Sequence, residues 1–194
     1  PVPNLVDVDT TTKTGALAQA LEEAPRFIVA VLQRDKSWIS IAEQGTSERQ
    51  GIVESEVPGQ HKQGGRSQMR FQRHIDFHVA EHLKKVADEL ARLAAASPLD
   101  VILGGTQEIV SELLAVLSEP VQRRVIGTFP VAHKQDGEQQ ILERATAVWR
   151  EREESAESKL FEQIVDAAKS GREGVLGAQP TLNALVEQKV RMLL

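Results

Sequence analysis

The first third of the chain contains short apolar runs separated by polar turns. Residues 26–33 (RFIVAVLQ) and 38–44 (WISIAEQ) are rich in apolar residues, and the polar turn RDKS at 34–37 separates them. Two such runs joined by a short polar turn predict a β-hairpin. Residues 50–58 (QGIVESEVP) alternate between polar and apolar side chains and predict a third strand, whereas residues 15–24 (GALAQALEEA) predict a short amphipathic helix.

The hydrophobic period changes in the next segment. Apolar residues recur there at spacings of four and three up to about residue 96, which predicts one apolar stripe along a long helix. Ser67 is the expected N-cap of this helix, and Pro98 is expected to end it because proline cannot continue a helix. The predicted stripe consists of Ile75, Val79, Leu83, Val86, Leu90 and Leu93.

A strand–helix–strand pattern follows the long helix. Residues 99–105 (LDVILGG) predict a buried strand, residues 107–118 predict a helix, and residues 121–131 predict another strand. Because the links between them are short, this order predicts a crossover unit with parallel strands. Together with the hairpin it makes residues 25–135 one mixed α/β domain, preceded by an N-terminal segment at 1–24.

The remaining residues predict a linker and a further domain. Residues 136–170 predict a long helix with a charged middle. Residues 171–194 predict a loop, a capped helix and the first residues of a strand, which we interpret as the beginning of an incomplete second α/β domain. The expected fold is therefore α/β, with a mixed sheet, long flanking helices and the start of a second domain.

Composition places the chain among soluble globular proteins. Hydrophobic residues make up 41% and charged residues 26% of its 194 residues. No apolar run is long enough to span a bilayer, so we expect no membrane partner and a cytoplasmic protein. The absence of cysteine excludes disulfides, thiolate metal sites and cysteine nucleophiles.

One segment differs in charge from the rest of the chain. The net charge is −5, yet residues 61–74 (HKQGGRSQMRFQRH) hold four fixed cations and no acid. The acidic remainder argues against a protein that coats DNA or RNA nonspecifically, and we expect no DNA partner. A local cationic patch can still contact phosphate at one point.

The glycine pair Gly64–Gly65 allows two interpretations. It matches neither the P-loop pattern, which needs Lys-Ser/Thr after the glycines, nor the three-glycine dinucleotide fingerprint. It is typical either of a flexible surface loop or of a tip at 59–67 whose backbone approaches a crowded target closely, because glycine lacks a Cβ.

Two other patterns carry weaker chemical signals. His74, His78 and His82 are spaced by four residues, and two such histidines can share a zinc ion. Each directly precedes an apolar stripe position, so we expect them to pack their rings at the edge of the core and expose a nitrogen, and we expect no metal site. The turn Gly104–Thr106 is similar to a phosphate-binding turn, but a tight turn with Thr106 as helix cap accounts for it better.

The segment HKQGGRSQMRFQRH and the helix after it carry a family resemblance. Residues 25–135 resemble the central domain of archaeal and eukaryotic class-1 peptide release factors, which is also related to Pelota-type proteins. Within that superfamily the tip is similar to that of bacterial release-factor-like proteins, HKQGG-x-SQ-x-R. Residues 171–194 resemble the beginning of the third domain of these factors, which is similar to kink-turn-binding ribosomal proteins.

The resemblance implies a mechanism and a partner. The partner is the ribosome, at the large-subunit rRNA of the peptidyl-transferase centre, together with peptidyl-tRNA. Gly64 and Gly65 would let the tip backbone fit there, and a glutamine would position water for attack on the peptidyl-tRNA ester, without metal or cofactor. The side chains implied to contact rRNA are His61, Lys62, Arg66, Ser67, Arg70 and Arg73.

The tip departs from the family pattern at one position. Arg66 stands where a release factor has glutamine, and a guanidinium group donates hydrogen bonds but accepts none. Gln68, in a longer tip, and Gln63, before the glycines, are the candidates for the missing amide, and backbone N–H groups could also orient the water. The resemblance thus implies a peptidyl-tRNA hydrolase acting in termination or ribosome rescue. The alternatives are a non-catalytic A-site factor and a non-ribosomal RNA-binding module.

Overall fold

The computed structural model describes residues 24–56, 66–131, 136–171 and 174–190, and it describes the side chains of these residues outside 66–72. The chain divides into two compact units, residues 1–149 and residues 150–194. The helix predicted at 15–24 lies almost entirely outside the described residues. The predicted domain boundaries stay predictions.

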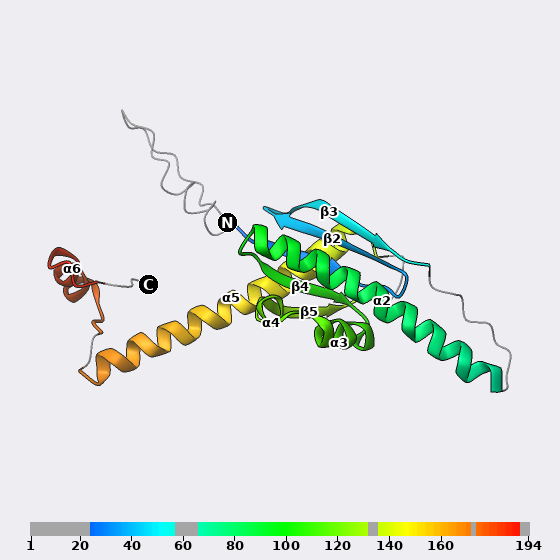
Figure 1. The fold of residues 1–194 in the computed structure, drawn as a ribbon. Coiled ribbons are helices and arrows are strands. Elements are labelled where there is room, and N and C mark those ends of the chain that lie inside the picture. The colour runs from blue at the N-terminus through cyan, green and yellow to red at the C-terminus, as the bar shows by residue number, and fades with distance from the viewer. Residues whose placement is uncertain (1–23, 57–65, 132–135, 172–173, 191–194) are drawn as a thin grey trace, which may run out of the picture. The chain divides into compact units, whose positions relative to one another are not determined.

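A five-stranded mixed sheet forms the centre of the first unit (Figure 1). The strand order is β3-β2-β1-β4-β5. The pairs β1–β2 and β2–β3 are antiparallel, whereas β1–β4 and β4–β5 are parallel, so the predicted hairpin and the predicted parallel crossover are confirmed. The strands are β1 (Arg26–Val31), β2 (Lys36–Glu43), β3 (Thr46–Glu54), β4 (Asp100–Gly105) and β5 (Val125–Pro130).

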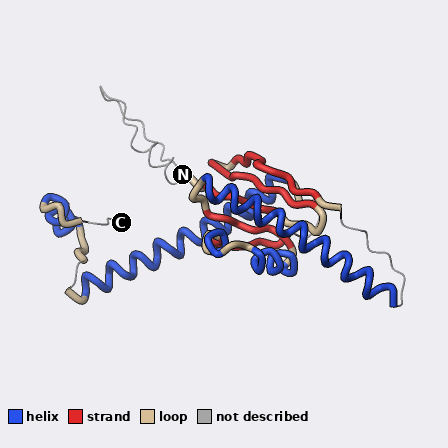
Figure 2. The backbone as a smooth tube through the Cα atoms, viewed as in Figure 1, coloured by secondary structure: helices blue, strands red, loops and turns tan. Residues whose placement is uncertain are grey.

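Helices cover both faces of the sheet (Figure 2). Strand β1 alternates between the two faces, because Ile28 and Ala30 belong to one buried cluster and Phe27, Val29 and Val31 belong to the other. A strand buried on both sides needs the continuous apolar run that this segment of the chain provides. The helices of this unit are α2 (Arg66–Ala96), α3 (Gln107–Val116), α4 (Glu119–Gln122) and the first part of α5 (Glu138–Lys169).

Helix α2 confirms the predicted apolar stripe. All six stripe residues are at most 7% exposed, and they pack with α3 on one face of the sheet. On the other face, Ile141, Leu142 and Ala145 of α5 join the second buried cluster. The position of Gly127 in β5 is directly below α5, where a Cβ would overlap Cγ1 of Val148.

Two predicted strand boundaries are wrong. Strand β3 begins at Thr46, four residues before the predicted start at Gln50, because a two-residue turn at Gln44 (φ 52°) and Gly45 (φ 78°) reverses the chain directly after β2. Turns with positive φ at both central residues match the twist of a hairpin. Hydrogen bonding between β2 and β3 therefore starts directly after the turn, and the polar residues that follow it become part of the edge strand β3.

The second boundary lies before β5. Residues 121–122 belong to helix α4 and not to the predicted strand 121–131, which begins only at Val125. Pro120 stands in the first turn of α4, where its missing N–H costs no hydrogen bond, and Val121 turns into the core. The prediction assigned Val121 to a strand because it is apolar, but it is buried as part of a one-turn helix.

The second unit contains the rest of α5 and helix α6 (Ala178–Val186). Helix α6 begins after Gly177, whose φ of 93° suits glycine. The strand predicted to follow it falls mainly on residues 191–194, outside the described residues. Across both units, the described helices include none with the length and apolar character needed to cross a membrane.

Candidate functional site at the root of the tip loop

The predicted tip residues divide into two groups. His61, Lys62, Gln63, Gly64 and Gly65 lie outside the described residues. The backbone of the next predicted residues forms the first turns of α2, although their side chains are not described; these are Arg66, Ser67, Gln68 and Arg70.

The start of α2 corrects one detail of the prediction. The helix begins at Arg66, so Ser67 lies within the first turn and is not the N-cap. Gln68 is the third residue of the helix, as the prediction of a first-turn position requires. Residues 55–65 therefore connect β3 to the first turn of a 31-residue helix.

The first turns of α2 project beyond the sheet (Figure 1). Among the described side chains, the buried stripe begins at Ile75, nine residues after the helix starts. At ~1.5 Å per residue the helix extends about 13 Å before its first described core residue. We name the first part of α2, residues 66–78, the stem; the segment predicted as the tip directly precedes it in the chain.

The stem has an outer face with a distinct composition. At ~100° per residue, positions 66, 70, 73 and 77 fall on the side of α2 opposite Ile75. Three of these positions are arginines, and the fourth is a phenylalanine. Among the described side chains there, Arg73 is exposed and Phe77 is 61% exposed.

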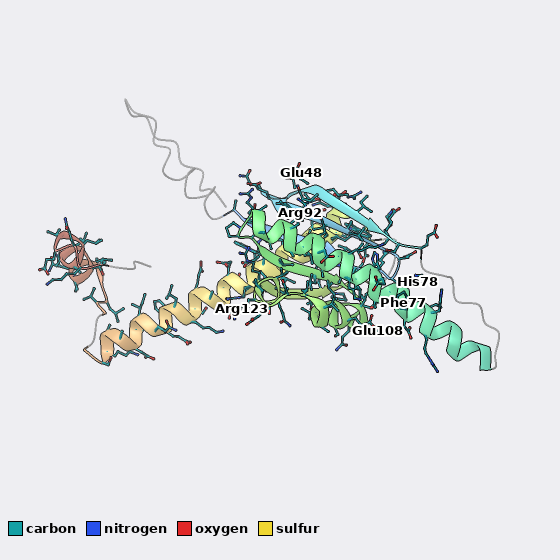
Figure 3. The ribbon with its side chains drawn as sticks, in the orientation of Figure 1. Glu48, Phe77, His78, Arg92, Glu108 and Arg123 are labelled. Atoms are coloured by element: carbon teal, nitrogen blue, oxygen red, sulfur yellow. The ribbon has the colours of Figure 1, made fainter. Side chains whose placement is uncertain are left out.

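Three aromatic rings lie next to each other on the stem. The ring centroids of His74 and His78 are 4.5 Å apart at an interplanar angle of 64°, and those of Phe77 and His78 are 5.8 Å apart at 78°. Figure 3 shows Phe77 and His78 at this end of α2. Within the described ranges no group of three or more His, Asp or Glu side chains has the arrangement of a metal site.

The prediction for His82 is wrong. Its side chain is fully buried instead of lying at the edge of the core with a nitrogen exposed. Nε2 lies 2.9 Å from Oγ of Ser37, and Nδ1 lies 3.1 Å from Oγ of Ser55. Sequence reasoning missed these partners because they come from β2 and from the segment after β3, 45 and 27 residues away in the chain.

The two serines give the buried ring a complete set of hydrogen bonds. Ser37 Oγ accepts the backbone N–H of Gln33 at 3.4 Å, and Ser55 Oγ lies 3.5 Å from Nζ of Lys85. Both ring nitrogens are satisfied when Ser37 donates to Nε2 and Nδ1–H donates to Ser55, which is the arrangement of a neutral imidazole. We name this group, Ser37, Ser55 and His82, the root cluster.

Burial is the main influence on the protonation of the root cluster. Burial lowers the pKa of His82, the charge of Asp35 raises it in part, and the charge of Lys85 lowers it further. The ring is therefore held neutral at neutral pH. Because the N–H of Ser55 also donates to the carbonyl oxygen of Asp35 at 2.9 Å, the chain is fixed from both sides just before it enters the tip loop.

A groove between α2 and α3 lies beside the stem and was not predicted. It has a volume of about 330 Å³, an apolar floor that includes Val79, Leu83 and Ile109, and a rim that carries the carboxylates of Asp76, Glu108 and Glu112. Glu108 pairs with Arg34 at 3.3 Å. The acidic rim disfavours phosphate, so the groove and the outer face of the stem have opposite electrostatic character.

The turn after β4 confirms a structural prediction. Thr106 caps α3, and its Oγ1 accepts the N–H of Ile109 at 3.5 Å. Gly104 and Gly105 complete the strand at the point where it meets the helix. Gly104 is required by packing, since a Cβ there would lie 2.5 Å from Cζ of Phe129.

Comparisons with known proteins agree on one superfamily. The family model of bacterial archaeo-eukaryotic release factor family 10 matches residues 13–150. Peptide chain release factor subunit 1 of Methanopyrus kandleri is 28% identical over 169 residues, covering 84% of this chain and 41% of that protein. Eukaryotic peptide chain release factor subunit 1 of Schizosaccharomyces pombe is 27% identical over 195 aligned positions, covering 96% of this chain and 45% of that protein.

A solved structure shows the same fold. The crystal structure of Pelota from Archaeoglobus fulgidus superposes with a TM-score of 0.51 at 14% identity, covering 89% of this chain and 49% of that one. The chain spans less than half the length of each of these relatives.

Proposed function

The chain belongs to bacterial archaeo-eukaryotic release factor family 10, and from this premise we propose that it hydrolyses the peptidyl-tRNA ester on the ribosome, in termination or in rescue of stalled ribosomes. The loop at 57–65 and the first turns of α2 would enter the peptidyl-transferase centre. The large-subunit rRNA and peptidyl-tRNA would be the partners.

The observation that carries the proposal is the stem with its fixed root. The segment with two glycines directly precedes about 13 Å of helix that extends beyond the first described core residue, and the root cluster fixes the chain shortly before this segment. A helical stem with cationic residues along it fits a deep site walled by RNA. A catalytic cleft on the body of the protein is not needed for such a reaction.

The chemistry requires positioning more than a strong base. Water adds to the carbonyl carbon of the ester, and the bond from that carbon to the ribose oxygen breaks. The peptide leaves as a carboxylic acid, and the ribose oxygen takes up the proton. A side-chain amide that accepts from the water and donates to the carbonyl region is enough to orient this attack.

The amide is assigned to Gln68, with Gln63 as the alternative. Arg66 occupies the place of the family glutamine, and its guanidinium cannot accept a hydrogen bond from water. Gln68 is in the first turn of α2, so its backbone stays close to the loop. Gly64 and Gly65 would admit the backbone between RNA and the tRNA end, because neither has a Cβ.

The cations have a separate role in the proposal. The side chains proposed to contact rRNA are His61, Lys62, Arg66, Ser67, Arg70 and Arg73. Phosphate contacts of this kind supply affinity and orientation with little sequence information. Because the whole chain carries −5, binding would be confined to this one projection.

The test uses the full chain and ribosomes that hold a labelled peptidyl-tRNA, with and without a codon in the A site. Peptide release and co-sedimentation are measured for the wild type, Gln68→Ala, Gln63→Ala and the double substitution Gly64→Ala/Gly65→Ala. The matched control is Gln72→Ala, which removes an amide one turn further along α2. Loss of release with Gln68→Ala at unchanged binding supports the assignment, whereas loss only with Gln63→Ala moves the role to that residue.

A second candidate function is favoured by Arg66. A protein that binds the A site without hydrolysis needs the cationic tip but not the amide, and arginine in place of glutamine suits that role. Ribosome binding without release by the wild type would establish this second function. Absence of ribosome binding, with salt-sensitive binding to free RNA, would instead indicate a non-ribosomal RNA-binding module.

A further inference from the structure

The exposed ring of Phe77 is the feature of the stem that the proposed function does not use. Burying this side chain would be favourable, yet it is 61% exposed. It lies two residues from the buried Ile75 and on the opposite side of α2. The core therefore does not account for a phenylalanine at this position.

The surroundings of Phe77 favour nucleic acid over an apolar protein surface. It shares the outer face of α2 with helix positions 66, 70 and 73, all arginines. Further along this face, Lys84 and Glu81 pair with each other at 2.8 Å, so the acid there is neutralised. The side chain thus presents an open ring beside fixed positive charge.

The neighbouring rings support the orientation of Phe77. His78 meets Phe77 edge-on at 78° and also meets His74 edge-on at 64°. A neighbouring ring at this angle contacts at most one face of the phenylalanine ring and restrains its rotation. A planar group can therefore stack on the ring from the solvent.

We propose that Phe77 is a stacking platform for one unpaired base of RNA, reached when the arginines of the same face contact the flanking phosphates. Aromatic side chains beside cations are the usual means by which proteins hold unpaired bases, since every base has a π-face that can stack. This inference rests on the proposed function, in which the RNA is the large-subunit rRNA that surrounds the stem. It adds a binding group roughly two turns along α2 from Arg70.

The experiment measures the affinity of the full chain for ribosomes at several salt concentrations. Phe77→Ala should weaken binding by about 5- to 150-fold, because a stacked base contributes ~1–3 kcal/mol. The slope of log affinity against log salt should stay at the wild-type value, since the substitution leaves every charge in place. Phe77→Tyr and Phe77→Trp should keep wild-type affinity because both retain a stacking ring.

The chain offers a matched control for this substitution. Phe161 in α5 is 58% exposed, close to the 61% of Phe77, but it lies outside the cationic segment. Phe161→Ala should leave ribosome affinity unchanged. Because both side chains are exposed, circular dichroism and thermal unfolding of both alanine variants should match the wild type.

Two results would overturn the inference while leaving the proposed function intact. One is wild-type affinity of Phe77→Ala on ribosomes that the wild type binds. The other is wild-type ribosome affinity of Phe77→Leu. Leucine has no ring, so this result would indicate an apolar interaction with protein. If the wild type itself does not bind ribosomes, the proposed function and this inference both fail.

Discussion

Nδ1 of His82 lies 3.1 Å from Oγ of Ser55, and this hydrogen bond ties the middle of α2 to the segment that leaves β3 for the tip loop. The ring is fully buried, whereas Ser55 is only partly buried, so the hydrogen bond is shielded from water on the side of the ring. Strand end and helix are thereby held in one arrangement on both sides of the loop. The root cluster fixes the loop's starting point without any side chain of the loop itself.

The protonation of His82 makes the stability depend on pH. Its pKa in the folded state is below the ordinary value of 6.5, chiefly because of burial, so the unfolded chain binds the proton more tightly. The stabilising contribution is complete above pH 6.5 and is lost as the pH falls from 6.5 through the folded pKa. We expect urea unfolding, followed by tryptophan fluorescence, to show lower stability at pH 5 than at pH 7.5.

Substitution of the ring identifies the source of that loss. His82→Gln should lower the free energy of unfolding at pH 7.5. It should also reduce the difference in unfolding free energy between pH 5 and pH 7.5. His74→Gln changes an exposed histidine of the same helix. It should leave the unfolding free energy, and its difference between the two pH values, close to those of the wild type. If this difference is unchanged in His82→Gln, other groups of the chain cause the pH dependence.

Ser37 and Ser55 should differ in their effects although both bond to the same ring. Ser37 is fully buried, so Ser37→Ala leaves Nε2 without a partner and should cost about 1–3 kcal/mol of unfolding free energy. Ser55 is only partly buried, so water can replace its hydroxyl and Ser55→Ala should cost less. Chemical denaturation of the two variants at pH 7.5 measures the difference.

Gly104 and Gly127 are required by packing, and alanine at either position should destabilise the fold. At Gly104 the added Cβ would lie 2.5 Å from Cζ of the buried Phe129, and at Gly127 it would overlap Cγ1 of Val148. Overpacking of this kind costs about 1–3 kcal/mol. Gly137→Ala is the control, since a Cβ there meets nothing within 4 Å, and thermal unfolding should show no loss. Equal melting temperatures for all three variants would contradict this account.

Charge reversal on the stem should reduce ribosome affinity and its salt dependence. Arg70→Glu/Arg73→Glu removes two cations that we propose bind phosphate, so the slope of log affinity against log salt should fall by roughly 0.7–0.9 for each of them. Arg123→Glu makes the same kind of charge reversal once, at an arginine that pairs with Glu119 in α4, far along the chain from the tip (Figure 3). Co-sedimentation of Arg123→Glu should equal that of the wild type, and a matching loss in both proteins would indicate a general effect of net charge.

Restoring the family residue at the tip gives a gain-of-function prediction. If the wild type binds the A site without hydrolysis, as in the second candidate function, Arg66→Gln supplies the missing amide and peptide release should rise at least about tenfold. Arg66→Lys keeps the charge without providing an acceptor and should not increase release. Release by Arg66→Gln no faster than by the wild type would favour Gln68 as an already sufficient amide.

Sequence patterns predicted the elements whose signals are periodic. The stripe from Ile75 to Leu93 and the end of α2 at Ala96 were both predicted, because a long amphipathic helix repeats its pattern many times. The start of β3 was not, since hydrogen bonding to β2 after the Gln44–Gly45 turn brings polar residues into the strand whatever their hydrophobicity. The local hydrophobic pattern therefore did not predict the start of a strand that is set by hydrogen bonding between backbones.

The parts of the site that were missed depend on interactions between distant segments. His82 was predicted as an edge residue because its two hydroxyl partners come from other elements, and no helical spacing reveals them. The groove beside α2 depends likewise on how α3 packs against it. The helix position of Phe77, opposite Ile75, is readable from spacing alone, but its exposure depends on the fold.

The way α2 is anchored determines how the stem responds to force. The buried stripe from Ile75 to Leu93 spans about 27 Å of helix, roughly twice the ~13 Å that precedes it. The buried part of α2 is therefore longer than the part that precedes Ile75. A helix segment this short, held by a longer buried segment, bends little at its free end. Forces on the loop pass along the helix axis into the sheet. The proposed insertion of the tip into a narrow channel would accordingly load the sheet through α2.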